Sequence, residues 1–329
     1  MQNYLLSCDW GTSSFRLRLV DVRDHQISGE ILSDEGVSGT YNRWKDSYDK
    51  HETSKEHFYS MHLQKNINAL SHSSNVDLAE TPVVISGMAC SSIGMKELPY
   101  ASLPFSIDGR NALVHRLSTS NGFSSDVWMI SGVRNRSDVM RGEETQIIGL
   151  KAIDDDAYTT KDLTCIFPGT HSKHVQIVKG EVVDFKTYIT GELFHVMAHH
   201  SILKDSVMGN GKQVLTEIDH DAFCHGVEQS GKSNLLQTLF SVRINQLFEH
   251  LSKEENFYYL SGLLIGTELR TLQNNTDSIM LCSGSSVFHL YEYGIRELGM
   301  VDQTIFVAPD RMDKVAMEGQ LKVFENYTA

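Results

Sequence analysis

The sequence lacks the features of proteins that bind membranes or nucleic acids. It has 329 residues, and no stretch approaches the roughly 18 to 20 uninterrupted apolar residues of a transmembrane helix. Lysine and arginine form no cluster longer than a pair, and 42 acidic against 29 basic residues give a formal net charge of -13. We therefore expect neither a membrane nor a nucleic acid among the partners of this chain.

Cysteine is scarce, and its spacing excludes two common uses. The 5 cysteines are far apart and form no C-x-x-C pair, so the sequence indicates neither a disulfide framework nor a zinc site. The N-terminal stretch MQNYLLSCDWG lacks the basic segment and the long apolar segment of a secretory signal. These absences predict a cytoplasmic protein with buried thiols.

A repeated order of strands and helices is the main feature that is present. Short apolar or alternating runs predict three strands, a helix and two buried strands at 4–9, 15–22, 26–33, about 54–71, 82–88 and 127–133. The second half repeats strand, strand, strand, helix at 163–170, 174–180, 181–190 and from Gly191 onward. Further helices are predicted at about 219–251, 285–298 and 310–326, and further strands at 279–282 and 304–308.

The length and this duplication predict two α/β domains that face one cleft. The stretch GEETQIIGLKAI, which begins at Gly142, has helical spacing and is followed by an acidic stretch with few apolar residues. We place the boundary before that stretch, with domains at 1–149 and 150–329.

The turn DWGTSS, after the first predicted strand, has the residue types that bind a polyphosphate. Gly11 has no Cβ that would block the backbone, and Thr12, Ser13 and the backbone N–H groups can donate to phosphate oxygens. Asp9 would repel phosphate directly, so its expected role is to hold Mg²⁺ through water beside the β and γ phosphates. A D-x-G-T stretch alone is equally typical of an ordinary turn.

A matching turn, PGTHS at 168–172, opens the second half. With the residue that follows, it supplies Gly169, Thr170, His171, Ser172 and Lys173. Two such turns could bind one nucleotide from opposite sides. The duplication therefore favours ATP binding over a pair of ordinary turns.

At this point the sequence resembles the sugar kinase, heat-shock protein 70 and actin superfamily, whose two ribonuclease-H-like (actin-like ATPase) domains flank a central cleft. It resembles the 2-dehydro-3-deoxygalactonokinase family in particular, in the stretches CDWGTSSFR, ISGMACSSIG, DVMRGEETQIIG, FPGTHSKHVQIVKGEVVDFKTYITGELF and LSGLLIGTEL. The resemblance implies a phosphotransferase with an alcohol group as acceptor. Such an enzyme uses ATP and Mg²⁺ to phosphorylate the 6-hydroxyl of 2-dehydro-3-deoxy-D-galactonate in galactonate catabolism.

The sequence departs from the family pattern after GMACS, where the family tends to show a basic residue and then a Gly-Trp pair. This chain has Ser92, Ile93, Gly94 and Met95 there. The exact sugar acid is therefore left open, with a kinase of another keto-deoxy sugar acid and a non-catalytic sugar or nucleotide sensor as alternatives. The oligomeric state is open too, and a homodimer is among the options.

A kinase of this kind needs a carboxylate that orients the attacking hydroxyl and accepts its proton. Glu143 and Glu144 begin the predicted helix after Gly142, where matching the helix dipole is the alternative role. Asp9 could serve if the metal ion is held otherwise. The sequence does not separate these three candidates.

Other residues are candidates for binding the two substrates. Arg16 and Arg141 could clamp a phosphate or the carboxylate of the sugar acid, or could be surface arginines. SGSS at 283–286 resembles the adenosine loop of the superfamily, so Gly284 and Ser285 are expected to bind ATP unless they only cap a helix. Further contacts with the sugar acid are expected at Gly87, Met88, Thr190 and Glu192.

Two motifs are expected to have no function of their own. GVEQSGKS at 226–233 matches the P-loop pattern, but polar DHDAFCHG with a helical period precedes it instead of a buried strand, so Lys232 is expected on the surface. His195 and His199 are four residues apart on a predicted helix, with no third ligand at a suitable spacing except Glu192. We expect them to be a structural pair.

Overall fold

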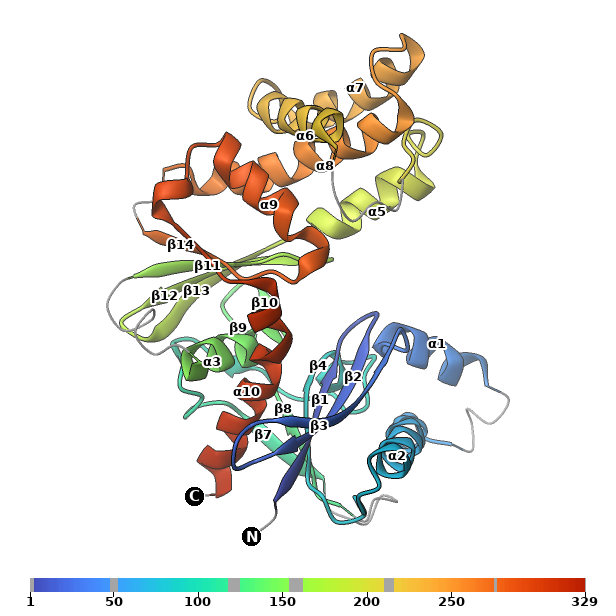
Figure 1. The fold of residues 1–329 in the computed structure, drawn as a ribbon, viewed down its shortest axis with the longest axis vertical. Helices are drawn as coiled ribbons and strands as arrows, with labels where there is room; N and C mark the ends of the chain where they lie inside the picture. The colour runs from blue at the N-terminus through green and yellow to red at the C-terminus, as the bar shows by residue number, and fades with distance from the viewer. Residues whose placement is uncertain are drawn as a thin grey trace. The chain divides into compact units, whose positions relative to one another are not determined.

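The structure, a computed structural model, describes residues 3–47, 53–117, 125–153, 162–209, 216–274 and 277–328. The chain divides into two units. The first comprises Met1–Thr160, Val178–Asp184 and Lys314–Ala329, and the second comprises Lys161–Ile177 and Phe185–Asp313. Figure 1 labels the helices and strands of both units.

A mixed sheet with the strand order β3-β2-β1-β4-β8-β7 is the basis of the first unit. Its strands are β1 (Tyr4–Trp10), β2 (Phe15–Asp21), β3 (Ile27–Ser33), β4 (Val83–Gly87), β7 (Val114–Leu117) and β8 (Val127–Ile130). β2 is antiparallel to β1 and β3, whereas β4 is parallel to β1 and β8 is parallel to β4. The three strands predicted at the start of the chain are confirmed.

Helices cover both faces of this sheet; in chain order they are α1 (Val37–Asp46), α2 (Lys55–Ser74), α3 (Glu143–Ile153) and α10 (Pro309–Thr328). Helix α2 begins where the Ser54 side chain accepts a hydrogen bond from the amide of His57, and it ends at Asn75 in the left-handed conformation. Its buried stripe, spaced at three or four residues, packs on the sheet and consists of Tyr59, Leu63, Ile67 and Leu70. Burial of such a side chain contributes about 1.5–3 kcal/mol.

Helix α10, the last helix of the chain, covers the opposite face. The ring of Phe324 meets that of Trp128 on β8 edge to face, with centroids 5.4 Å apart. The side-chain amide of Gln320 is buried and donates to the carbonyl of Cys8 at 2.9 Å and to the hydroxyl of Ser86 at 2.8 Å. The C-terminal residues thus complete the unit that the N-terminal residues begin.

Two glycines let α10 cross α3 at close range (Figure 1). A Cβ on Gly149 would lie 1.8 Å from the carbonyl oxygen of Val315, and a Cβ on Gly319 would lie 1.9 Å from that of Thr145. Real Cβ atoms do not approach backbone oxygens so closely, so both positions require glycine. Helix α3 carries Glu143 and Glu144, whose positions therefore depend on this crossing.

We expect Gly319→Ala to lower the free energy of unfolding by about 1–3 kcal/mol, because the helices must separate to admit the methyl group. Gly39→Ala is the matched control, since a Cβ at that exposed position of α1 meets nothing within 4 Å. The control should gain about 0.5–1 kcal/mol from the higher helix propensity of alanine. Urea unfolding of both variants checks the prediction, and equal stabilities would contradict it.

The second unit repeats the sheet of the first. Its strands are β11 (Leu163–Phe167), β12 (Ser172–Val178), β13 (Glu181–Tyr188), β14 (Ser278–Leu281) and β15 (Thr304–Phe306). Their order, β15-β14-β11-β12-β13, corresponds to β8-β4-β1-β2-β3. β11 is antiparallel to β12 and parallel to β14, as β1 is to β2 and β4. The prediction of two α/β domains of the same ribonuclease-H-like type is confirmed.

The helices of the second unit include one that the sequence did not predict; in chain order they are α5 (Thr190–His200), α6 (Glu217–Gln229), α7 (Leu235–Leu247), α8 (Lys253–Leu269) and α9 (Ser285–Glu297). The unexpected helix is α8, which is buried on nearly all sides between residues 256 and 269. Such a helix has no polar face, so its sequence shows no amphipathic period.

Shorter elements connect these parts. They are η1 (Met88–Cys90), β5 (Ala101–Ser102), β6 (Phe105–Ser106), β9 (Val133–Arg134), β10 (Val139–Met140), η3 (Arg270–Leu272) and η4 (Val301–Gln303). Strands β10, β9 and β5 form a small separate sheet. The segment Val178–Asp184 belongs to the first unit, where Glu181 and Val182 pair with Ser106 and Phe105.

Candidate active site

The first predicted phosphate turn is the hairpin between β1 and β2. Trp10 and Phe15 form its closing pair, and the amide of Gly11 donates to the carbonyl of Ser14 at 2.9 Å. In the part of the chain that the structure describes, no hydrogen bond uses the backbone amides of Thr12 and Ser13 at the tip. An anion can accept a hydrogen bond from each of these two N–H groups.

The N-terminus of α1 donates hydrogen bonds to the carbonyl groups of this turn. The amide of Val37 donates to the carbonyl of Gly11 at 2.9 Å, and the amide of Ser38 donates to that of Thr12 at 3.0 Å. Gly36 permits the approach, because a Cβ there would lie 2.4 Å from the carbonyl oxygen of Thr12. A trans peptide directs its N–H opposite to its C=O, so the two amides at the tip point away from α1.

Asp9 lies at the end of β1, directly opposite Arg16 of β2. The two side chains form an ion pair with 2.8 Å between Asp9 Oδ2 and Arg16 Nη1. The side chain of Asp9 is 19% exposed and that of Arg16 is 48% exposed, so both are accessible to a ligand. The sequence did not predict this pairing, although two residues opposite each other in a hairpin are expected to interact.

Gly87, at the end of the neighbouring strand β4, brings the start of α3 near Asp9. It has a positive φ of 89°, and a Cβ there would lie 3.5 Å from Asp9 Oδ1. A Cβ on Gly142, just before α3, would lie 3.6 Å from the Cα of Gly87. The structure therefore gathers three separate predicted stretches, from β1, from β4 and from the start of α3, within the first unit.

The structure separates the two glutamates that the sequence could not. Glu144 is fully buried and accepts hydrogen bonds from the amide of Gly142, at 2.8 and 3.0 Å, and from the hydroxyl of Thr145. Burial, and then the charge of Glu143, raise the pKa of Glu144 to about 8. Glu143 is partly exposed and accepts from the amide of Arg141 at 3.0 Å. At neutral pH, Glu144 is thus the carboxyl that holds a proton.

This pKa makes stability depend on pH in a definite direction. The pKa of Glu144 in the folded protein, about 8, exceeds its ordinary value of 4.5. The contribution of this carboxyl to the free energy of unfolding is therefore fully present below pH 4.5 and is lost as the pH rises to 8. We expect Glu144→Gln, which does not titrate, to flatten the curve of unfolding free energy against pH by up to about 1.4 kcal/mol per pH unit. Urea unfolding at a series of pH values tests this, and parallel curves would contradict it.

Arg141 makes contacts that hold the segment after β4. Its guanidinium donates to the carbonyl of Cys90, to the carbonyl of Leu98 at 3.5 Å and to the Tyr100 hydroxyl at 2.9 Å. It also lies over the ring of Tyr100, 4.1 Å from the centroid. Met88 lies in η1, at the start of the segment that Arg141 holds.

The second predicted turn, between β11 and β12, is held in the same manner as the first. The amide of Glu192, in the first turn of α5, donates to the carbonyl of Thr170 at 3.0 Å. A Cβ on Gly191 would lie 2.5 Å from the carbonyl oxygen of Gly169. The amide of His171 therefore points away from α5, as the amides of the first turn point away from α1.

The remaining side chains of this turn have partners within the second unit. His171 pairs with Glu192, and the buried Lys173 donates through Nζ to the carbonyl of His171 at 2.9 Å. Ser172 is fully buried, with its hydroxyl 2.9 Å from the hydroxyl of Tyr291. Thr190 donates to Glu268, a residue that the sequence did not single out.

The predicted adenosine loop has the expected local structure. It lies between the end of β14 and the start of α9, and Gly284 is the N-cap residue of that helix. A Cβ on Gly284 meets nothing within 4 Å, so the backbone there is open to a ligand. No side chain caps the helix, and Gly284 itself stands at the cap position, so the assignment of this loop to adenosine stays a prediction.

A family model described as 2-keto-3-deoxy-galactonokinase matches residues 9–319, a range that begins at Asp9 and contains both turns. The chain belongs to this kinase family. The resemblance seen in the sequence motifs is thereby confirmed.

Individual relatives of the 2-keto-3-deoxy-galactonokinase family agree with this assignment. The chain is 34% identical over 230 residues to the 2-dehydro-3-deoxygalactonokinase of Escherichia coli (strain K12), covering 67% of this chain and 72% of that one. It is 30% identical over 306 residues, 90% of each chain, to a probable 2-dehydro-3-deoxygalactonokinase of Rhizobium meliloti (strain 1021). A crystal structure of a protein from Sinorhizobium meliloti, described as a putative 2-dehydro-3-deoxygalactonokinase, has a TM-score of 0.75 and 26% identity, covering 96% of this chain and 95% of that one.

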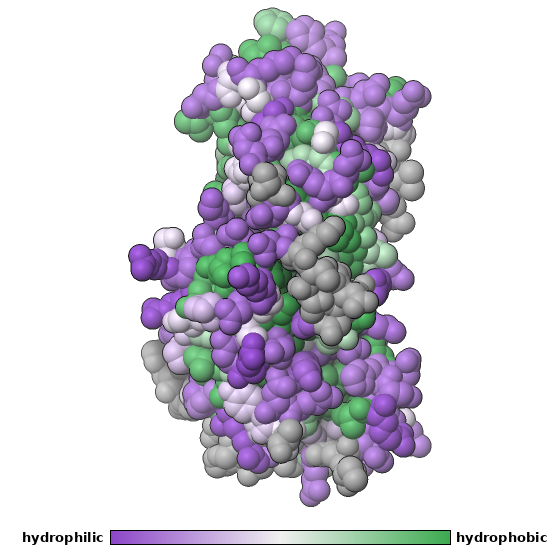
Figure 2. All heavy atoms as spheres, turned by 90° about the vertical axis from the view of Figure 1, so that its left-hand side faces the viewer, coloured by the Kyte–Doolittle hydropathy of each residue, from purple (hydrophilic) through white to green (hydrophobic). Residues whose placement is uncertain are grey.

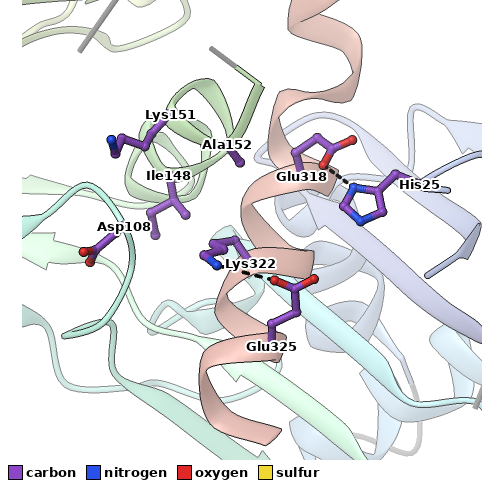
Figure 3. Close-up of a pocket in the computed structure, with 8 residues that line it drawn as sticks. All are labelled: His25, Asp108, Ile148, Lys151, Ala152, Glu318, Lys322 and Glu325. Atoms are coloured by element: carbon purple, nitrogen blue, oxygen red, sulfur yellow. Dashed lines mark hydrogen bonds and ion pairs between the residues drawn. The ribbon is translucent and has the colours of Figure 1, made fainter. Parts of the chain in front are cut away.

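A cavity of about 380 Å³ lies elsewhere in the first unit of this kinase-family chain (Figure 3). It is lined by His25, Asp108, Ile148, Lys151, Ala152, Glu318, Lys322 and Glu325. His25 pairs with Glu318 at 2.8 Å, and Lys322 pairs with Glu325 at 3.5 Å. No residue of the predicted site lines it, so we assign it no role in the reaction.

The P-loop motif has the wrong structural context. Gly226 lies inside α6, where a Cβ would be 2.2 Å from the carbonyl oxygen of Tyr259, and Lys232 pairs with Glu228 at 2.7 Å on the surface. A P-loop follows a strand, so this stretch is not one. His195 and His199 stack on each other along α5. Within the described residues, no group of three or more His, Cys, Asp and Glu side chains could hold a metal ion.

The described surface fits the composition of the chain. Hydrophilic residues predominate on the face shown in Figure 2, and hydrophobic residues form small patches there. None of the helices in the described ranges is both long enough and apolar enough to span a bilayer.

Proposed function

We propose that this chain is an ATP-dependent kinase that phosphorylates the 6-hydroxyl of 2-dehydro-3-deoxy-D-galactonate. The observation that carries the proposal is the pair of equivalent turns, one in each unit, each held by the N-terminus of a helix. Membership in the 2-keto-3-deoxy-galactonokinase family supports the substrate class. We propose the cytoplasm as the location, since Cys8, Cys90, Cys165 and Cys282 are free and buried thiols.

We propose that the backbone amides at the tip of each turn bind phosphate groups of ATP. In the first turn these are Thr12 and Ser13, beside Gly11, and in the second they are Thr170 and His171, beside Gly169. The buried Ser172 and Lys173 shape the second turn from inside, and Gly284 and Ser285 bind the adenosine moiety. Such donors stabilise phosphate charge without reorganising during the reaction.

Asp9 suits a magnesium ion that ATP brings with it. Asp9 is one partly exposed carboxylate beside the predicted phosphate turn, and no group of three or more His, Cys, Asp and Glu side chains among the described residues could hold a metal ion. This arrangement fits Mg²⁺ held mainly by phosphate oxygens and water. When bound, the ion neutralises phosphate charge. Arg16, the present partner of Asp9, then becomes available to bind an anionic group of either substrate.

We propose Glu143 as the general base. Its carboxyl is partly exposed, whereas Glu144 is fully buried and protonated at neutral pH, so only Glu143 is ready to accept the proton of the 6-hydroxyl. Glu144 positions the start of α3 through the amide of Gly142. Arg141 positions the segment that carries Met88, and the sugar acid binds near Gly87, Met88, Thr190 and Glu192.

A coupled assay of ADP release with a panel of keto-deoxy sugar acids tests the proposal. We expect turnover with 2-dehydro-3-deoxy-D-galactonate to exceed that with its stereoisomers and with acids of other chain lengths. A higher kcat/KM for another acid would assign a different substrate to the same site. Absence of turnover with every acid, together with retained binding of sugar acid or nucleotide, would support the sensor alternative.

We expect Lys232→Ala to leave kcat and KM unchanged. Lys232 forms an exposed pair with Glu228, and such pairs contribute at most about 1 kcal/mol to stability. Steady-state kinetics of the purified variant checks this. A large loss of activity would revive the P-loop interpretation, which predicts that this lysine binds phosphate.

A further inference from the structure

A buried polar cluster lies beneath the second turn, and Glu268 is at its centre. Glu268 belongs to α8, is 2% exposed, and its carboxylate meets His174 Nε2 at 3.0 Å, the Tyr291 hydroxyl at 2.9 Å and the hydroxyl of Thr190. The hydroxyl of Tyr291 lies 2.9 Å from that of Ser172. We define the Glu268 cluster as Glu268, His174, Tyr291, Thr190 and Ser172.

The four partners of Glu268 in the cluster come from elements that our proposed function assigns to ligand binding. Ser172 and His174 lie on β12, immediately after the second phosphate turn. Thr190 begins α5, and the amide of Glu192 on the same helix donates to the carbonyl of Thr170 in that turn. Tyr291 lies on α9, the helix that starts at the adenosine loop. One carboxylate therefore links the second phosphate turn, the start of α5 and the helix that follows the adenosine loop, all within the second unit.

The direction of the hydrogen bonds follows from chemistry. Burial and then the charge of Glu268 raise the pKa of Tyr291 well above its ordinary value. The phenol therefore keeps its proton and donates a hydrogen bond to Glu268. Ser172 then donates to Tyr291, and its oxygen accepts from the amide of Gly169 at 3.4 Å. The chain of donors runs from the turn to Glu268, so the carboxylate orients the serine that shapes the turn.

Packing alone does not require a glutamate at this position. Its neighbours on α8 include the buried Leu264, Ile265 and Leu269, and an apolar side chain would fill the same volume. Burying a carboxyl group is costly unless donors compensate, and here three donors do so. Polar groups of this kind specify one arrangement of the elements around them.

We propose that Glu268 is a positioning residue that sets the second phosphate turn and the start of α9 for binding ATP. This inference rests on the proposed function for the meaning of the turn, but it concerns nucleotide affinity and not the identity of the sugar acid. Glu268 acts through Ser172, Thr190 and Tyr291 and does not itself touch the substrates.

Glu268→Gln and Tyr291→Phe test the proposal. The first change leaves one acceptor oxygen for three donors, and Tyr291→Phe keeps the ring while removing the hydroxyl between Ser172 and Glu268. We expect either change to raise KM for ATP, and Kd for a non-hydrolysable ATP analogue, about tenfold, equivalent to about 1.4 kcal/mol. Tyr291→Phe leaves Thr190 bonded to Glu268, so this variant should change KM for the sugar acid less than about twofold. Thr267→Val is the matched control, because among the described residues its hydroxyl bonds to its own helix alone, at the carbonyl of Leu263.

Calorimetric titration and steady-state kinetics on the full chain separate the outcomes. Wild-type protein that binds no ATP analogue would overturn the proposed function and this inference with it. Wild-type binding without turnover of any acid would count against the proposed function alone, while the Kd of the variants still tests Glu268. Unchanged Kd and KM for ATP in a folded Tyr291→Phe protein, or equal increases in the KM of both substrates, would overturn the positioning role. If Glu268→Gln fails to fold, Tyr291→Phe decides.

Discussion

Replacing Asp9 with alanine should abolish phosphoryl transfer, with a loss in kcat of at least about 10³-fold. Asp9 is the acidic side chain beside the first phosphate turn, with its carboxylate partly exposed at the end of β1. Its removal takes away the ligand that we propose for Mg²⁺ and leaves Arg16 without its partner. The effect should appear mainly in kcat, because the variant keeps the backbone amides that we propose to bind phosphate. Coupled kinetics and calorimetric titration with an ATP analogue measure the two quantities.

The control for this prediction is Asp24→Ala. Asp24 lies in the turn between β2 and β3, at the opposite end of β2 from the Asp9 turn. Within the described ranges, its side chain accepts a hydrogen bond from the amide of Gln26 and from no other group. This variant should keep the activity of the wild type. If Asp9→Ala turned over ATP at a rate within about tenfold of the wild type, neither a metal ligand nor a base could be assigned to this carboxylate.

Glu143→Gln should lower kcat by about 10²–10⁴-fold, the usual range for a lost general base. Glutamine keeps the size of the side chain and can still accept from the amide of Arg141, so the start of α3 should stay in place. Because the reaction loses its proton acceptor and not its binding contacts, KM for both substrates should change little. The measurement is steady-state kinetics of both substrates at neutral pH.

Glu144→Gln provides the comparison. Glu144 is fully buried and holds its proton at neutral pH, so glutamine resembles its protonated form, and we expect a loss within about tenfold. The opposite ranking, with Glu144→Gln the more damaging change, would move the base to Glu144. It would also mean that substrate binding exposes the carboxyl of Glu144.

The strands and the two turns could be predicted because their signals are local. Alternation in β2, with Phe15, Leu17 and Leu19 buried, and the small residues of the turns depend only on neighbours in the chain. Helix α8 was missed because it is buried on nearly all sides. Helix α1 was missed because it is short, contains Gly39 and buries only Val37 and Thr40.

The positioning residues could not be predicted because their partners are distant in the chain. Gln320 bonds to Cys8 across 312 positions, and Glu268 bonds to His174 across 94. A polar residue in a helical pattern does not reveal whether it faces water or a buried backbone group. The two glutamates of α3 posed a similar problem, since adjacent helical residues point in different directions and only the packing decides which one is buried.

The return of α10 to the first unit has a consequence for biosynthesis. Residues 314–329 belong to that unit, and the face of its sheet that carries Trp128 lacks the contacts of Gln320 and Phe324 until they arrive. A nascent chain therefore cannot finish its N-terminal half while the ribosome is still translating, even though nearly all of that half has already emerged. Premature termination near the end of the message should yield a product that chaperones retain and proteases remove, because the missing piece belongs to the part that was made first.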